Sequence, residues 1–307
     1  MKTIIIALIM SLSMQSFSCS MDGKGGFAPP NNEYIPEDNG LSFAPTTMEE
    51  NDFNNVLDKV ENTYAPIMQK MGLDLNIIRK WDDGTVNAVA YPANGKANVE
   101  MFGGLARHQE ATIDALALVA CHEIGHHIGG VPKVRTLIFF KQWAANEGQA
   151  DYFASLKCFR RVFENEDNFA AIQGLNIPTT LQKKCAESFK DSNEYSLCVR
   201  NGLAGQALAK LLASLRKSTV PSFETPSKST TLIFTNHSHP EAQCRLDTYL
   251  AGAICTKSAH TDVSQTSAKP GTCQGEPVGS RPSCWFAKYD SIFGANLLGI
   301  NGNIVEE

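Results

Sequence analysis

The sequence predicts an α+β fold that is mainly helical, with a small antiparallel sheet and a cysteine-containing C-terminal tail. In several long stretches apolar residues recur every three or four positions, which is typical of amphipathic helices. Residues 73–102 instead hold short apolar runs separated by turn-forming residues, which is typical of a small sheet. The chain has 307 residues and a net charge of −5. It is long enough for a sizeable core, and its acidic balance excludes a broad basic surface for nucleic acid.

The N-terminus has the pattern of a secretory signal peptide over residues 1–18. Lys2 precedes an apolar stretch from Ile4 to Met14, which is too short for the roughly 20 residues of a membrane-spanning helix. We therefore expect the rest of the chain to be exported.

Cys19 lies where a bacterial lipoprotein signal carries the cysteine that becomes acylated. The resemblance is incomplete, because Ser16 stands where such signals carry leucine. Two alternatives remain: a lipid anchor at Cys19, for which Ser20 favours the outer membrane, or cleavage to a soluble secreted protein. With the anchor, we expect a bacterial protein of the periplasm or outer membrane that contacts a membrane only through Cys19.

Composition divides the rest of the chain into three parts. Residues 19–45 are rich in Gly, Pro, Asn and acidic residues, which predicts a tether. Residues 46–255 contain the periodic segments and predict one domain. Residues 256–307 hold scattered Gly and Pro with little periodicity, which predicts a disulfide-pinned extension.

The first half of the predicted domain contains a helix and a hairpin. Apolar residues from Phe53 to Met71 have helical spacing. Val86–Tyr91 and Ala97–Phe102 flank an Asn94-Gly95 turn, which predicts an antiparallel hairpin.

The second half is predicted to be helical. A strongly apolar helix at residues 113–128 ends at Gly129 and Gly130, which are helix stop signals. Further helices are expected at residues 142–163 and 202–217, and a last one begins near Pro240.

The helix at 113–128 contains the pattern H-E-x-x-H, as His122, Glu123 and His126. Four residues of α-helix turn through about 400°, so both imidazoles lie on one stripe and can share a metal ion. Glu123 lies about 100° round from His122, where it can reach a water on the metal without being a ligand, as a general base must. The alternative is two packed histidines on a core helix.

A catalytic zinc site usually has three protein ligands. A histidine six residues after His126 would complete a metzincin site, but that residue is Pro132, which cannot ligate. The other solution is a glutamate on a following helix, where Glu147 and Asp151 lie on one face. Glu147 would close the metal site, and Asp151 would accept the second ring N–H of a ligand histidine. The alternative is two acidic residues on a helix surface.

The chain resembles the gluzincin metallopeptidases related to the CAAX prenyl protease and the heat-shock peptidase HtpX, in particular their soluble exported bacterial members. Besides the zinc helix, the resemblance is carried by Val86–Ala90, Val99–Leu105, Glu147–Asp151, and Ser238-His239-Pro240 with Arg245. These segments span roughly residues 50–250 in the family's order. The transmembrane helices of the integral members are missing, and the tail after residue 255 has no counterpart.

The resemblance implies a zincin-like fold and a zinc-dependent endopeptidase of envelope or extracellular proteins. One Zn²⁺ would be bound by His122, His126 and Glu147, with Glu123 as the general base. Val99–Leu105 would be the edge strand that pairs with an extended polypeptide substrate.

The same resemblance assigns two late residues. His239 would stabilise the oxyanion or take the fourth coordination position at rest, although it also fits a histidine that only precedes a helix. Arg245 would anchor the His239 loop against an acidic partner. Two other functions stay open: a catalytically silent, zinc-containing chaperone or binding module of the envelope, and a secreted toxin-like protease with a host substrate.

Nine cysteines favour an oxidising compartment. Setting aside Cys19 and Cys121 leaves seven, an odd number, so at least one stays free or pairs with Cys121. We expect Cys121 to be a free buried thiol. The expected pairs are Cys185–Cys198 and Cys255 with Cys273 or Cys284.

Overall fold

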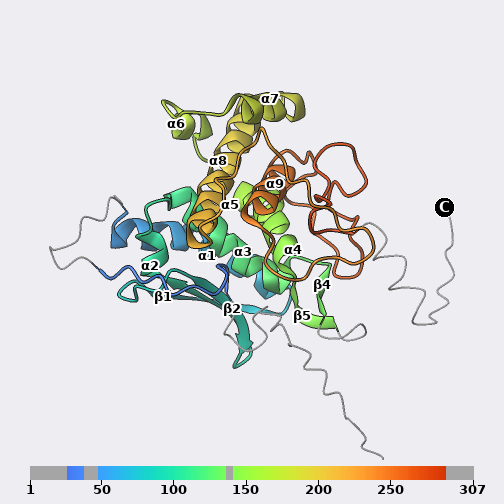
Figure 1. Cartoon of the computed structure of the whole chain (residues 1–307). Helices are drawn as coiled ribbons and strands as arrows, with labels where there is room; N and C mark the ends of the chain where they lie inside the picture. Colours follow the sequence, from blue (N-terminus) through green and yellow to red (C-terminus); the bar gives the residue numbers. More distant parts are fainter. Residues whose placement is uncertain (1–25, 38–47, 136–140, 288–307) are drawn as a thin grey trace, which may run out of the picture.

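A three-stranded sheet lies at one side of the molecule, and the helices are stacked above it in an α+β arrangement (Figure 1). The computed structural model describes residues 26–37, 48–135 and 141–287. The predicted signal peptide and Cys19 lie outside the described residues, as does the end of the predicted extension, residues 288–307. None of the helices in the described ranges is both long enough and apolar enough to cross a membrane.

The sheet consists of β1 (Asp74–Lys80), β2 (Ala88–Ala93) and β3 (Lys96–Phe102), in the order β1-β3-β2. β2 and β3 form the predicted antiparallel hairpin, whose turn residues Asn94 and Gly95 have φ of 54° and 74°, as a two-residue hairpin turn requires. β1, however, pairs with β3 in parallel. The prediction of a purely antiparallel sheet is therefore wrong, and the sheet is mixed.

The predicted edge strand is also wrong. Because β1 and β2 flank β3, residues Val99 to Phe102 lie in the central strand, and Gly103–Ala106 form the short helix α2. Val99–Leu105 therefore cannot pair with a substrate as an edge strand. A parallel partner such as β1 joins the sheet through tertiary packing and leaves no turn signal in the sequence. The outer strand of the hairpin is β2.

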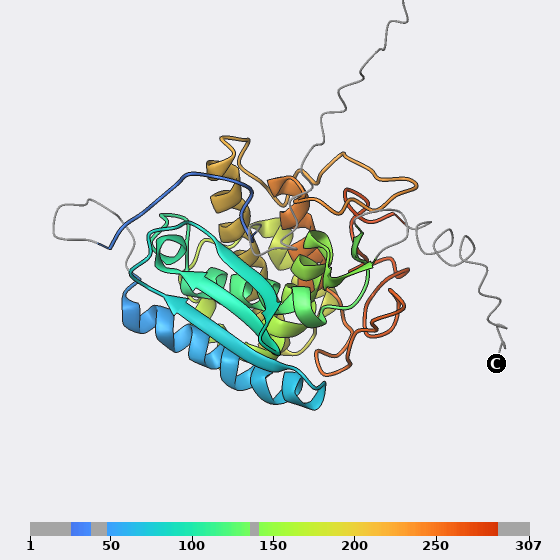
Figure 2. The same cartoon turned by 90° about the horizontal axis from the view of Figure 1, so that it is seen from below.

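Two long helices pack on this sheet (Figure 2). α1 (Glu50–Lys70) packs on β1, and α3 (Ile113–Ile128) packs on β2, β3 and α1. Both confirm the helices predicted from apolar spacing. The Thr112 hydroxyl accepts a hydrogen bond from Ala115 N–H and so caps α3. The metal motif thus lies in the last two turns of a helix that is held between α1 and the sheet.

The chain after α3 forms a short hairpin and then a continuous helical stretch. Its elements are β4 (Lys133–Arg135), β5 (Lys141–Ala145), α4 (Glu147–Phe153), the π-helical turn η1 (Ala154–Cys158) and α5 (Phe159–Phe163). The helix predicted from residue 142 therefore begins at Glu147. Asn146 sets this start, because its side-chain oxygen accepts a hydrogen bond from Gln149 N–H.

The remaining helices follow in sequence order. They are α6 (Asn168–Ile172), α7 (Thr179–Ser188), α8 (Ser192–Leu215) and α9 (Ala242–Ala253). α8 begins at Ser192 rather than at the predicted Gly202, because the Asp191 carboxylate caps it by accepting hydrogen bonds from two backbone N–H groups. α9 packs beside α8 and confirms the helix predicted near Pro240.

Four disulfides join cysteines of the described residues. They are Cys121–Cys158, Cys185–Cys198, Cys244–Cys284 and Cys255–Cys273. The prediction of a free Cys121 is wrong, because Cys121 of α3 forms a disulfide with Cys158 of η1. The predicted local pair is confirmed, and Cys255 takes one of its two predicted partners. The described part of the predicted extension, residues 256–287, is thereby pinned beside α9.

The first described segment, residues 26–37, also packs on the domain. Phe27 and Ala28 are buried in the main apolar core. The prediction of a tether is therefore wrong for this segment, because the burial of Phe27 and backbone hydrogen bonds to residues 84–88 dock a Gly- and Pro-rich stretch that has no periodicity.

Candidate metal centre

The two histidines of the motif bring their ring nitrogens together from successive turns of α3. His122 Nε2 lies 3.1 Å from His126 Nε2, and both side chains are buried. His122 Nδ1 lies 2.8 Å from Asp151 Oδ1, and His126 Nδ1 lies 2.8 Å from the Ala145 carbonyl oxygen. Since these oxygens only accept, each Nδ1 carries a proton, which leaves Nε2 as the ring atom that can bind a metal.

Glu147, the first residue of α4, faces both histidines. Its Oε2 lies 3.3 Å from His122 Nε2, and its Oε1 lies 3.6 Å from His126 Nε2. Glu147 is only 1% exposed, so it is not a surface acid. α4 can approach this closely because residue 125 is glycine: a Cβ there would lie 3.0 Å from the Ala150 carbonyl oxygen.

His239 reaches the same place from the loop before α9. Its Nε2 lies 3.5 Å from Glu147 Oε2. Asn146, the N-cap of α4, holds this loop, because its side-chain NH₂ group donates to the Asn236 carbonyl oxygen at 3.1 Å. The structure thus brings together all the residues that the sequence and the resemblance proposed as ligands.

The side chains are spaced as the ligands of one metal ion would be. Two ligands of a tetrahedral zinc, each about 2.1 Å from the metal, lie about 3.4 Å apart, and the separations here are 3.1, 3.3, 3.5 and 3.6 Å. Glu147 Oε2 and both carboxylate oxygens of Glu123 are buried without a hydrogen-bond partner among the described residues. Buried carboxylates are normally paired or bound to a metal. His122, Glu123 and His126 form a buried group that could hold a metal ion.

Behind His122, the Asp151 carboxylate lies in a network with two residues of α9. Arg245 donates to both of its oxygens, at 2.8 and 2.6 Å, and the Tyr249 hydroxyl donates at 2.7 Å. Burial alone would raise the pKa of Asp151, but Arg245 and His122 hold it below its ordinary value. Asp151 therefore stays ionised and can fix the His122 ring, and it is the acidic partner expected for Arg245.

The titratable groups of the centre differ in pKa. Burial raises the pKa of Glu123 to about 8 and lowers that of His126 to about 4. Burial also opposes the charge of Glu147, yet the neighbouring histidines, His239 first, lower its pKa. A neutral His126 and an ionised Glu147 are the forms that bind a metal. A carboxyl group with a pKa near neutrality suits a general base.

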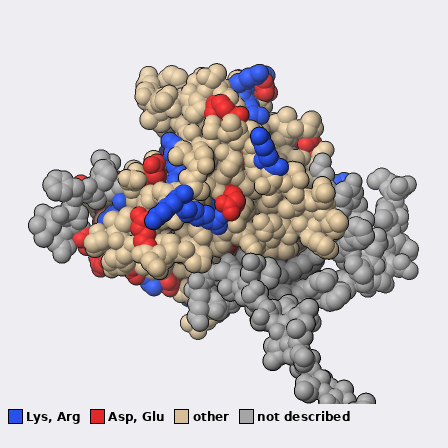
Figure 3. Space-filling view, viewed as in Figure 1, with Lys and Arg blue, Asp and Glu red and all other residues tan. Residues whose placement is uncertain are grey.

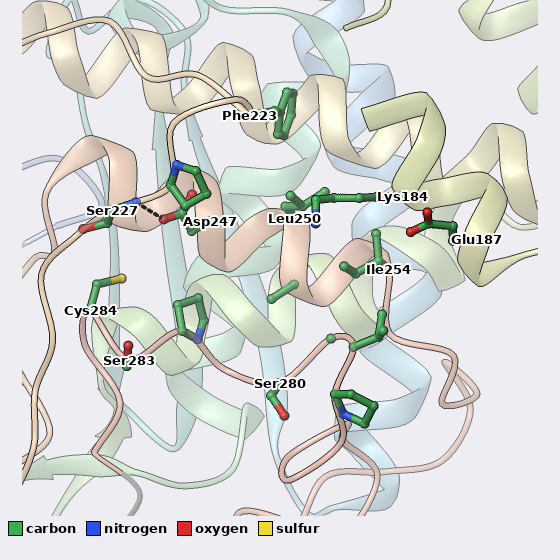
Figure 4. A pocket seen from close by; sticks show the side chains of 16 residues that line it. Lys184, Glu187, Phe223, Ser227, Asp247, Leu250, Ile254, Ser280, Ser283 and Cys284 are labelled. Atoms are coloured by element: carbon green, nitrogen blue, oxygen red, sulfur yellow. Dashed lines mark hydrogen bonds between the residues drawn. The ribbon is translucent and has the colours of Figure 1, made fainter. Parts of the chain in front are cut away.

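Two other features of the described residues are separate from this centre: the charges on one face and a cavity beside α9. On the face shown in Figure 3, basic side chains stand singly or in small groups, and most of the surface is uncharged. A cavity of about 350 Å³ lies between α7, α9 and residues 277–284, and Lys184 and Asp247 are among the residues that line it (Figure 4). None of the candidate metal ligands lines this cavity.

Sequence reasoning missed three residues of the centre. Tyr249 lies one turn after Arg245, a helical spacing that could have predicted a shared face. Asn146 precedes Glu147 and has the chemistry of an N-cap. Phe27 packs edge-on against His122, with 5.3 Å between the ring centroids, and no local signal in the sequence points to it.

No protein-family model, no curated protein and no solved structure matches this chain significantly.

Proposed function

We propose that this chain is a zinc-dependent metalloendopeptidase, similar to the exported gluzincins related to the CAAX prenyl protease and HtpX. The observation that carries the proposal is the convergence of His122, His126 and Glu147, at 3.1 to 3.6 Å from one another, beside the unpartnered Glu123 carboxylate. Two imidazoles and one carboxylate are a ligand set of catalytic zinc in peptidases, which supports zinc rather than another metal.

The residues of the centre then have distinct roles. When bound, zinc supplies Lewis acidity that polarises a peptide carbonyl and lowers the pKa of water. Glu123 accepts the proton of the attacking water and delivers it to the leaving amine. Asp151 and Arg245 keep the His122 ring in place from behind.

His239 is assigned to the oxyanion. Its Nε2 lies 2.6 Å from a peptide carbonyl oxygen, that of Gly26, so it is placed to donate a hydrogen bond to such a group. A donor of this kind stabilises the negative charge that develops on a carbonyl oxygen during attack.

We further propose that the protein works outside the cytoplasm. Four disulfides among the described residues support an oxidising compartment. A lipid anchor at Cys19 would keep the enzyme at the bacterial outer membrane, and cleavage without acylation would release it as a secreted enzyme.

Metal content and proteolysis of the purified protein test the function together. We expect one zinc ion per chain, loss of casein cleavage after chelation, and recovery when zinc is added back. His126→Ala should abolish both zinc binding and cleavage. The matched control is His260→Ala, because the His260 side chain is 65% exposed and pairs with Glu164 instead. Full zinc loading without cleavage of casein would favour the silent binding module.

A further inference from the structure

Residues 26–35, which we call the strap, lie against the metal centre. The Gly26 carbonyl oxygen is 2.6 Å from His239 Nε2, and the Phe27 carbonyl oxygen accepts a hydrogen bond from Arg245 at 2.7 Å. The Phe27 ring contacts His122 on one side and the Arg245 guanidinium, 4.3 Å from its centroid, on another. A peptide carbonyl and an aromatic side chain of the chain itself therefore stand beside the candidate zinc ligands.

The strap, deep blue in Figure 2, runs antiparallel to residues 84–88, which lead into the outer strand β2. Tyr34 and Thr85 form an antiparallel bridge. An extended peptide that adds to the edge of a sheet makes backbone hydrogen bonds of this kind. The bonds are Phe27 N–H to Ala88 O at 2.9 Å, Val86 N–H to Glu33 O at 3.3 Å and Ile35 N–H to Gly84 O at 2.6 Å.

The site of the strap selects for particular side chains. A Cβ at Gly26 would lie 2.3 Å from the Ala88 carbonyl oxygen and 2.6 Å from Asn87 Oδ1. Only glycine therefore fits at this position, because any larger residue would force its neighbours to move. The next residue, Phe27, is fully buried. Asn87 Oδ1 accepts a hydrogen bond from Ala28 N–H at 2.9 Å and fixes the register. The site therefore reads a glycine followed by a large aromatic residue.

Burial alone would also fit a segment with only a structural role. The strap, however, is bound by side chains of the candidate metal centre. Its two carbonyl groups are bound by His239 and Arg245, which are the side chains of the late motif. His239 Nε2 is closer to the Gly26 oxygen, at 2.6 Å, than to Glu147, at 3.5 Å. If His239 is the oxyanion donor, a carbonyl bound to it occupies the position that a substrate carbonyl needs.

We propose that the strap occupies the substrate position of this centre in cis and keeps the enzyme partly latent, with reduced turnover, until it leaves. Once free, the same position binds extended peptides that carry glycine followed by an aromatic residue. The latency rests on the proposed peptidase function, whereas the binding of such a peptide does not.

The first test loosens the strap at its anchor. Phe27→Ala should raise kcat/KM for casein by at least about tenfold, because a buried aromatic anchor dominates the binding of a segment. The control is Asn32→Ala, an exposed residue of the same segment, which should change kcat/KM by less than about twofold. A folded, zinc-loaded Phe27→Ala protein that is no more active than wild type would overturn the proposal.

Because Phe27 also belongs to the main apolar core, a second test leaves the amino-acid sequence of the strap unchanged. A recognition sequence for a site-specific protease is inserted within residues 38–47 of the Glu123→Gln chain, which does not consume the probe. After cutting and gel filtration, a fluorescent peptide with the sequence of residues 24–35 should bind at least about tenfold more tightly than to the uncut protein. Peptides with Gly26→Ala or Phe27→Ala should bind at least about tenfold more weakly. Equal binding to cut and uncut chains, or equal binding of the altered peptides, would overturn the proposal.

The same cut in the wild-type background separates the two proposals. Casein cleavage that is equally fast before and after cutting, with no binding of the strap peptide, overturns the strap and leaves the peptidase function standing. Binding of the strap peptide without casein cleavage by any form supports the strap as occupant and overturns the peptidase function.

Discussion

His122 Nδ1 lies 2.8 Å from Asp151 Oδ1, and both side chains are fully buried. This contact joins the face of α3 that carries the candidate ligands to α4, and Arg245 extends it to α9. One imidazole is thus oriented by helices that are far apart in the sequence. A carboxylate in this place raises the basicity of the ligand histidine and fixes its ring.

Asp151→Asn should weaken both zinc binding and the fold. An amide cannot accept all the hydrogen bonds of the carboxylate, and it leaves the Arg245 charge buried without a counter-ion. We expect the free energy of unfolding to fall by about 3–5 kcal/mol. Zinc affinity, measured by competition with a chelator, should fall by about 10–100-fold.

Asp114→Asn is the matched control for this variant. Asp114 also pairs with an arginine, Arg200, at 2.8 and 2.7 Å, but it does so at the start of α3, away from the metal motif. This variant should lower the free energy of unfolding and leave zinc affinity unchanged. Equal loss of zinc affinity in both variants would contradict the role given to Asp151.

Glu123→Gln should stabilise the metal-free protein at alkaline pH. Burial raises the pKa of Glu123 from 4.5 to about 8 in the folded chain, so between these values the folded state holds a proton that the unfolded state has lost. The free energy of unfolding therefore falls as pH rises through this window. Glutamine removes this pH dependence. At pH 8 the free energy of unfolding of the variant should therefore exceed that of wild type by an amount on the order of a few kcal/mol.

Urea unfolding of both chelator-treated proteins at pH 5 and pH 8 measures this difference. Because the titratable groups that do not interact with Glu123 are shared, their contributions cancel in the comparison. The difference in unfolding free energy between variant and wild type should be larger at pH 8 than at pH 5. A difference that does not change with pH would show that Glu123 titrates normally.

The Cys121–Cys158 disulfide should support zinc binding as well as stability. It ties the turn of α3 that carries His122 to the helical stretch that begins with Glu147. The double variant Cys121→Ala/Cys158→Ala should lose about 3–4 kcal/mol of unfolding free energy, as for a cross-link that closes a loop of this length. Zinc affinity should also fall.

Removal of Cys185–Cys198 is the comparison for that experiment. This disulfide joins α7 to α8, away from the metal centre, and its cysteines are 13 residues apart instead of 37. The corresponding double variant should lose about 3 kcal/mol of unfolding free energy and keep its zinc affinity. If both double variants bind zinc like wild type, the Cys121–Cys158 link is not needed to align the ligands.

His239→Ala distinguishes the two roles that the sequence left open. If His239 stabilises the oxyanion, kcat should fall by about 100- to 1000-fold while zinc stays bound. If it takes the fourth coordination position at rest, weaker zinc binding should be the main defect of the variant. Zinc content and kcat measured on the same preparation separate these outcomes, and our assignment expects the first.

The proximity of the candidate ligands on helices could be predicted from the sequence because helical geometry is local. The spacing of His122 and His126 places both on one stripe, and the same rule places Glu147 and Asp151 on one face. Their contacts in the structure follow this expectation. His239 and Arg245 could be proposed only through the resemblance, since nothing local connects them to α3.

The features that were missed or wrong depend on tertiary contacts. The parallel pairing of β1 with β3, which makes β3 central, leaves no mark on the sequence of either strand. Cys121 finds its partner on another helix, 37 residues away. Phe27 lies in a stretch whose composition predicts a tether, and only its docking against His122 and Arg245 shows otherwise.

Casein cleavage and zinc content of Glu123→Gln, measured side by side with wild type, test the central claim most directly. Because Glu123 is the proposed base and not a ligand, the variant should keep its zinc while kcat/KM falls by about 100-fold or more. If the variant keeps both its zinc and its cleavage of casein, the proposed peptidase mechanism is wrong.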